Sequence, residues 1–121
     1  MPDGLSTANA TAMLDALVDV AYVQLHTGDP GANGTANVSS VTTREATGGF
    51  SVSGNVATAV DEPEWTSWAG TNGEVVTDIS LWSASSSGTF GGSMELNSSV
   101  TMDTGDSLTL TSISITIPTA S

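Results

Sequence analysis

Apolar side chains near the N-terminus recur at the spacing of a helix. Ser6 and Thr7 can cap the first turn, and residues 8–21 contain neither Gly nor Pro. The apolar stripe consists of Met13, Leu14, Leu17, Val18 and Ala21. This pattern predicts a helix over roughly residues 7–20, stabilised mainly by docking of the stripe against the rest of the protein.

From residue 21 onward apolar positions alternate with polar ones, which is typical of half-buried strands. Residues 22–26 are expected to form a strand, and residues 41–47 and 50–60 are further β-rich stretches interrupted by Gly-containing turns. A longer alternation starts at residue 75. One side of that strand is expected to carry Val75, Thr77, Ile79 and Leu81.

The last third of the chain predicts a hairpin followed by a bent ladder. Residues 85–88 form the hairpin turn, Gly91-Gly92 marks a kink, and residues 103–106 form another turn. The inward positions after this turn are Leu108, Leu110, Ile113, Ile115 and Ile117. Because they change from even to odd numbers, we expect a bulge or bend near residues 111–112.

These short strands, separated by Gly-rich turns, predict the fold class. Alternating strands at spacings of about 8–12 residues are typical of all-β sandwiches and barrels. We therefore expect an antiparallel β-sandwich of jelly-roll type with one short N-terminal helix. The length of 121 residues fits a single domain over residues 1–121.

Charge narrows the choice of partners. The chain has 13 acidic residues but only one basic side chain, Arg44, which gives a formal net charge of −12. Proteins that bind nucleic acid or an anionic membrane need clustered Lys and Arg, so both partners are excluded. Concentrated salt screens repulsion among carboxylates, which indicates a halophilic source. The alternative is an acidic surface that serves only solubility.

Groups able to perform catalysis are scarce. There is no Cys or Lys nucleophile, and His26, the only His, lies at the end of a predicted strand, where hydrogen bonding to backbone is its usual role. Asp61, Glu62 and Glu64 form the densest carboxylate cluster, for which a solvated turn is favoured over a glycosidase pair. We therefore expect neither an enzyme nor a bound cofactor.

Other residues leave alternatives open. A structural cation could be held by Asp61, Glu62 and Glu64, or by Asp103 with Asp106. Neither set has the spacing of a calcium-loop motif, so plain turns are favoured. Trp65, Trp68 and Trp82 are expected in the core, with a subunit contact or a glycan platform as the alternatives. Glycosylation signals of the form Asn-x-Ser/Thr occur at Asn9, Asn33, Asn37 and Asn97.

One segment resembles a known viral family. Residues 22–31, YVQLHTGDPG, are similar to the LHTGDPG signature of small structural proteins of tailed viruses, described as tail-fibre, minor tail or head-surface proteins. The signature places His26, Gly28, Asp29, Pro30 and Gly31 in a structural turn. Similarity continues, in the same order, at residues 12–17, 44–46, 76–84, 88–92 and 103–110. Residues 50–70 align poorly, so their tryptophans inherit no role.

The resemblance implies a part of a virus particle and not an enzyme. Arg44 and His26 are then structural, with the Arg44 guanidinium expected to bind carbonyls or a carboxylate such as Asp29. The acidic excess indicates a virus of halophilic archaea. The N-terminus lacks the basic region of a secretory signal, which fits assembly in the host cytoplasm and release by lysis within the virion.

The leading hypothesis is a subunit of the virion surface, either a capsid decoration or a turret protein. It would form a symmetric homo-oligomer and dock on other virion proteins such as capsid or tail subunits. The alternative is a tail-fibre or baseplate component, against which stands the absence of heptads and repeats. A third class is a module that binds host surface glycans through Trp65 and Trp68.

The charge analysis predicts folding that depends on salt. The thermal midpoint should rise clearly between dilute buffer and multimolar KCl, because roughly 1 M salt reduces the Debye length to about 3 Å and screens the carboxylates. Melting followed by circular dichroism in both buffers measures the change. Equal midpoints would contradict a halophilic source.

Overall fold

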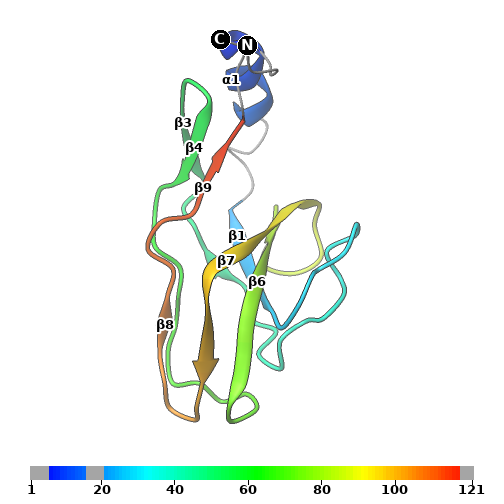
Figure 1. Ribbon diagram of the computed structural model, residues 1–121, viewed down its shortest axis with the longest axis vertical. Coiled ribbons are helices and arrows are strands. Elements are labelled where there is room, and N and C mark those ends of the chain that lie inside the picture. Colours follow the sequence, from blue (N-terminus) through cyan, green and yellow to red (C-terminus); the bar gives the residue numbers. More distant parts are fainter. Residues whose placement is uncertain (1–5, 16–20, 118–121) are drawn as a thin grey trace.

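Strands dominate the computed structural model, which describes residues 6–15 and 21–117 (Figure 1). One helix, α1 (Thr7–Asp15), precedes the strands in this part of the chain. The strands are β1 (Tyr22–His26), β2 (Glu45–Ala46), β3 (Phe50–Ser53), β4 (Val56–Ala59), β5 (Glu64–Trp65), β6 (Glu74–Trp82), β7 (Phe90–Met102), β8 (Leu108–Thr109) and β9 (Ser114–Thr116).

The strands form two layers that enclose the core. One layer is a four-stranded sheet in the order β2-β1-β6-β7, and the facing layer is divided into β3-β4-β9 and the pair β5-β8. All neighbouring strands are antiparallel. Side chains from both layers meet in the core, which includes Val23, Leu25, Phe50, Ala57, Ile79, Leu81 and Ile113. The prediction of an all-β antiparallel sandwich with one short helix is confirmed.

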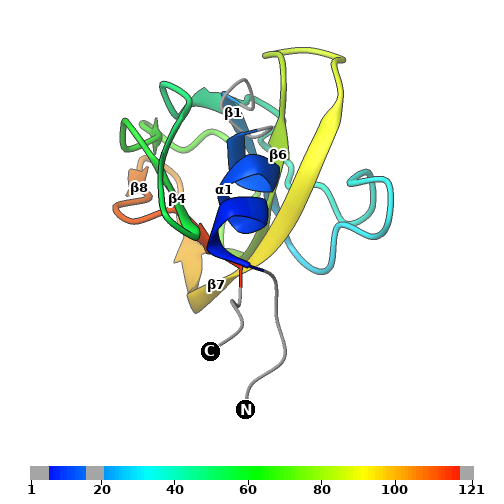
Figure 2. The same cartoon turned by 90° about the horizontal axis from the view of Figure 1, so that it is seen from above.

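Helix α1 lies over one end of the sandwich, beside the hairpin of β3 and β4 (Figure 2). Ser6 caps it, since its Oγ accepts the N–H of Asn9 at 3.2 Å. Ala10 and Leu14 are buried, whereas Met13 is exposed despite its place in the predicted stripe. The helix was expected over residues 7–20; residues 16–20 lie outside the described part.

The pairing of β6 with β7 contains a large irregularity. Val76 pairs with Val100 and Asp78 with Glu95, so residues 96–99 of β7 face Thr77 alone. This shift changes which residues of β6 share a face. Val76 is fully buried beside Ile79 and Leu81, while Val75 is 41% exposed.

The expectation that Val75 shares one side of the strand with Ile79 and Leu81 is therefore wrong. Strict alternation would require a regular ladder, and the irregularity at Thr77 breaks it. The second irregularity lies at the expected glycine kink, where Leu81 pairs with Gly92 and Trp82 with Phe90.

The expected bend near residues 111–112 is present, and it is the place where the chain leaves one sheet and joins another. β8 pairs with β5, whereas β9 pairs with β4, so the chain passes from one sheet to another between them. Leu110 N–H donates to the Pro63 carbonyl at 3.0 Å, and the Ile113 carbonyl accepts the Ala59 N–H at 2.9 Å. The change from even to odd inward positions marks this crossing.

The β-rich stretch at residues 41–47 is shorter than expected. Only Glu45 and Ala46 form a strand, β2. The backbone before β2 forms hydrogen bonds with side chains instead of with a strand. The Thr43 carbonyl accepts Trp65 Nε1–H at 2.9 Å, and the Val41 N–H donates to Ser39 Oγ at 3.1 Å. These partners replace a neighbouring strand.

The irregular register predicts opposite outcomes for two adjacent substitutions. Val76→Asp should destabilise the protein by roughly 3 kcal/mol or more, because it places a carboxylate without a partner in the core. Val75→Asp should change stability by less than about 1 kcal/mol. Urea unfolding followed by Trp fluorescence measures both. Equal losses for the two variants would show that the register is assigned wrongly.

Candidate functional site

The loop that carries the LHTGDPG segment is held together by its own hydrogen bonds. Asp29 Oδ1 accepts the Gly31 N–H at 2.9 Å, and Asn37 Nδ2 donates to the Asp29 carbonyl at 2.9 Å. The N–H of Ala36 reaches the carbonyl of the buried Pro30, also at 2.9 Å. These contacts fix the shape of the loop between β1 and β2, which fits a structural role for the segment.

His26, at the end of β1, joins this loop to the sheet. Its Nδ1 lies 2.8 Å from the Ala36 carbonyl, an acceptor only, so Nδ1 carries the proton. Its Nε2 lies 2.7 Å from Ser80 Oγ, which also accepts Trp82 Nε1–H at 2.7 Å. When the imidazole is neutral with its proton on Nδ1, the Ser80 hydroxyl donates to Nε2. Burial lowers the pKa of His26, and this outweighs the raising effects of the Ala36 carbonyl and the Asp78 carboxylate.

A Ser hydroxyl beside a His imidazole is the chemistry of a nucleophile and its base. Here both residues are fully buried, so no substrate reaches Ser80. Its hydroxyl is also committed on two sides, to His26 and to Trp82. The arrangement ties β1 to β6 and to the loop, and it cannot act on an external bond.

Arg44 stabilises the tip of the hairpin between β6 and β7. Its Nη1 donates to the carbonyls of Ala84 and Ser87, at 2.9 Å and 2.7 Å. The guanidinium carbon lies 4.1 Å from the centroid of the Trp82 ring, a cation–π contact. Partial burial lowers the pKa of Arg44. Carbonyls are thus its hydrogen-bond partners, while the Asp29 carboxylate bonds within its own loop.

The Trp82 ring, which contacts Arg44, also packs against a second aromatic side chain. Trp82 and Phe90 pack at 5.4 Å between ring centroids with a tilt of 49°. Gly34 lies against Phe90, and a Cβ at this position would stand 2.5 Å from the ring. Its φ of +72° also favours glycine. Gly34 in the loop and Arg44 just before β2 therefore both lie against aromatic side chains of the hairpin strands.

Trp65 and Trp68 are core residues of this chain. They are 3% and 2% exposed, and their Nε1–H groups donate to the carbonyls of Thr43 and Thr71. A hollow of about 200 Å³ reaches both side chains and Glu45. Burial leaves the indoles without a free face on which a sugar could stack.

The acidic candidates do not gather into a site. Glu64 Oε2 accepts the Thr109 hydroxyl at 2.9 Å, and Asp106 Oδ2 accepts the Asp103 N–H at 2.9 Å, as in a turn. Over residues 6–15 and 21–117, no group of three His, Asp or Glu side chains is placed to hold a metal ion. In the same part of the chain, no helix is long and apolar enough to cross a membrane.

Glu74, at the start of β6, is a structural residue that the sequence pattern did not single out. Its carboxylate accepts hydrogen bonds from the Ser39 hydroxyl and from the hydroxyl and N–H of Ser40, the last two at 2.6 Å and 3.2 Å. Burial alone raises the pKa of Glu74, but these hydrogen bonds outweigh burial and lower it. The contacts fix the far end of the loop on the sheet.

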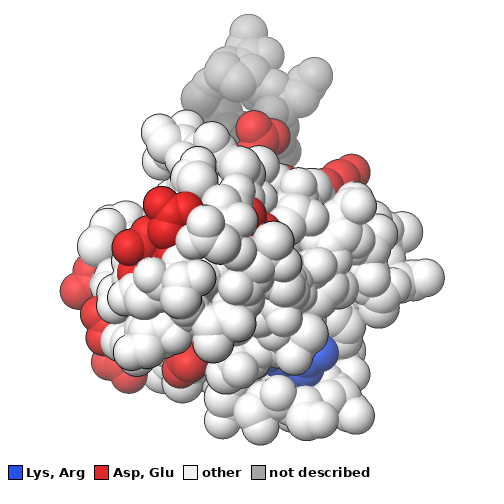
Figure 3. Space-filling view, turned by 90° about the horizontal axis from the view of Figure 1, so that it is seen from below, with Lys and Arg blue, Asp and Glu red and all other residues white. Residues whose placement is uncertain are grey.

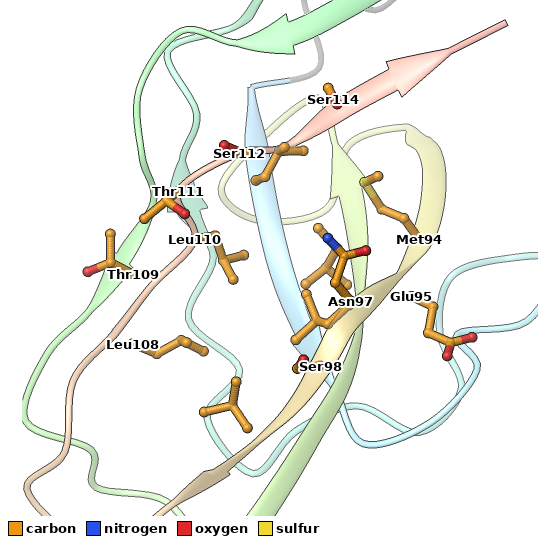
Figure 4. Close-up of a pocket in the computed structure, with 14 residues that line it drawn as sticks. Met94, Glu95, Asn97, Ser98, Leu108, Thr109, Leu110, Thr111, Ser112 and Ser114 are labelled. Carbon is orange, nitrogen blue, oxygen red and sulfur yellow. The ribbon is translucent and has the colours of Figure 1, made fainter.

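A slot of about 320 Å³ lies between β7 and residues 108–114 (Figure 4). Its walls are partly apolar, with Leu96, Val100 and Leu110 among them, and Glu95 is their only charged residue. A nucleophile needs a neighbouring base, and the slot contains no His.

The network around His26 predicts how stability changes with pH. The folded state binds a proton at His26 less readily than the unfolded chain, so stability from the neutral imidazole is complete above about pH 6.5 and is lost as the pH falls below it. His26→Gln, which cannot titrate, should show a flatter dependence. Urea unfolding of both proteins between about pH 7.5 and pH 5 measures this difference. Identical slopes would contradict it.

Comparisons with known proteins identify the family. No curated protein matches the chain. The family model described as podophage GP4 fiber I protein gp80 matches residues 4–118, almost the whole sequence. This match supports the expected virion structural protein, and it fits the tail-fibre alternative better than capsid decoration. The chain belongs to the podophage GP4 fiber I protein gp80 family.

Proposed function

We propose that the protein is a non-enzymatic structural subunit of a viral tail, placed in a tail fibre or baseplate and held there by contacts with copies of itself and other virion proteins. The observation that carries this proposal is the match of residues 4–118 to a phage fiber family. Because the match spans the sandwich, it concerns the whole described fold and not one motif.

The side chains with potential reactivity support a structural role. His26 and Ser80 bond to each other inside the protein, and Arg44 and Glu74 hold a hairpin and a loop. Each group is committed to an internal partner that fixes an irregular segment on the sheet. A tail component must keep its shape under mechanical load, and such contacts resist local opening of loops.

The absence of heptads and repeats from the sequence is the argument against a tail-fibre component. That argument assumes that a fibre component is elongated by itself. The family match supports the opposite view, since a chain with a sandwich fold belongs to a fiber family. A sandwich can serve as one module of a longer assembly, and its own length then says little about the shape of the assembly.

The location of the subunit in purified particles tests the proposal. Immunogold electron microscopy with an antibody against this chain should label tails, while an antibody against the major capsid protein labels heads. Separation of heads from tails by centrifugation, followed by mass spectrometry, gives an independent answer. Label confined to heads would overturn the tail assignment, and its absence from particles would overturn the structural role.

A further inference from the structure

The loop that follows β1 is attached to the sheet at its two ends by different chemistry. At one end the fully buried His26 bonds to the Ala36 carbonyl at 2.8 Å. At the other end the carboxylate of Glu74 accepts hydrogen bonds from residues 39–40. We call the segment between these two attachments, residues 27–38, the 27–38 loop.

Protonation changes what the His26 ring needs from its surroundings. The neutral ring donates to Ala36 and accepts at Nε2 from the Ser80 hydroxyl, 2.7 Å away. A protonated ring has two donors, so the Ser80 oxygen must accept a second N–H beside that of Trp82. The Ser80 hydroxyl proton then loses its present acceptor, inside a region where both His26 and Ser80 are fully buried. The closed structure is therefore poorly suited to the charged ring.

Charged groups on the neighbouring strands do not remove this conflict. Asp78, paired with His26 between β6 and β1, favours the protonated ring, but burial outweighs it and lowers the pKa of His26. Beyond Asp78 on β7 lies its partner Glu95, and on the other side of β1 the paired strand β2 carries Glu45. Arg44 lies over an indole ring, and Figure 3 shows it away from the carboxylates that gather on the left of that face.

The carboxylates inside the loop and at its far end are engaged in hydrogen bonds. Asp29 is the only charged residue of the loop, and its Oδ1 accepts the Gly31 N–H at 2.9 Å. The hydrogen bonds to Glu74 lower its pKa, so this carboxylate stays ionised at the pH at which a histidine titrates. Mild acid therefore acts on the attachment at His26 and not on the one at residues 39–40.

We propose that mild acid opens the 27–38 loop while the sandwich stays folded, with protonation of His26 as the trigger. The charged ring gains water when the loop moves away and takes the Ala36 carbonyl with it. The bonds of Glu74 keep the far end of the loop on the sheet. This property belongs to the folded chain and goes beyond the proposed function, since it does not depend on the place of the subunit in a particle.

The other contacts that hold the loop closed are few and local. Thr27 N–H donates to the Asn37 carbonyl at 2.8 Å, and Gly34 lies against the Phe90 ring. The strand pairs of both layers do not include residues 27–38. Local opening therefore leaves the sheets intact and changes the surface that this part of the protein presents.

Hydrogen exchange measured by NMR between about pH 7.5 and pH 5 tests the opening, with each rate compared with that of the unfolded chain at the same pH. The loop amides of Thr27, Gly34 and Ala36 should lose protection by roughly tenfold or more, because each pH unit below about 6.5 favours the open form by up to about tenfold. The strand-bonded amides of Ala59 and Leu110 should stay far better protected at pH 5. Equal protection of both sets at that pH would mean that only global unfolding exposes the loop, and would overturn the proposal, as would loop protection that does not change with pH.

Two single variants identify the titrating group. His26→Gln should remove the pH dependence of loop protection, because glutamine does not titrate. Asp29→Asn is the matched control: it keeps an oxygen that can accept the Gly31 N–H but removes the only carboxylate of the loop, so it should behave like the wild type. A His26→Gln protein with the pH dependence of the wild type, or an Asp29→Asn protein without it, would contradict the assignment of the trigger.

A third measurement needs no variant. His26 is the only histidine, so its ring C–H resonances can be followed directly in the wild type. They should titrate with the same midpoint as the loop resonances, of which Gly34 should lose the ring-current shift caused by Phe90. Clearly different midpoints would show that loop opening and protonation of His26 are separate events.

Discussion

Thr77 on β6 faces residues 96–99 on β7, and this mismatch between two paired strands has consequences on both sides of the sheet. On β6 it turns Val76 into the core beside Ile79 and Leu81 and leaves Val75 exposed. On β7 the extra residues lengthen and bend an edge strand, as bulges do. The slot lies beside these residues of β7.

The chain has almost no positively charged side chains, so its carboxylates need hydrogen-bond partners of another kind. With Arg44 as the only basic side chain, carboxylates cannot be satisfied by ion pairs in general. Glu74 therefore bonds to serine hydroxyls and an N–H, and Arg44 to carbonyls and an indole ring. Such bonds to neutral groups connect segments far apart in sequence, as Glu74 and Ser40 do across 34 positions. They hold irregular segments through neutral partners and not through ion pairs.

Local pattern was enough to predict much of the fold. Alternation located β1 and the strands around the hairpin at residues 85–88, and the change of inward positions after Leu110 located the crossing between sheets. The exact phase of β6 was not predictable, because it depends on residues 96–99 of another strand. The strand expected at residues 41–47 was also too long, since its backbone partners are side chains from distant segments.

In the candidate site, too, roles that depend on neighbouring residues could be predicted, and roles that depend on residues distant in the sequence could not. Turn residues such as Asp29 and Gly31 act within a few positions, so their structural role could be inferred from the sequence. Ser80 and Glu74 could not, because their roles appear only when His26 and Ser40 are brought to them by the fold. The slot between β7 and residues 108–114 could not be inferred from the sequence either, since each of these two segments has the pattern of an ordinary strand with an inward face.

An acidic surface affects assembly as well as solubility. Like charges oppose contact between copies in most orientations, and a nearly neutral surface leaves a small set of orientations in which they can meet. Specificity then arises from repulsion elsewhere more than from strong attraction at the contact. With a single Arg, this chain can supply few charged pairs, so a contact between copies would have to rely on neutral groups.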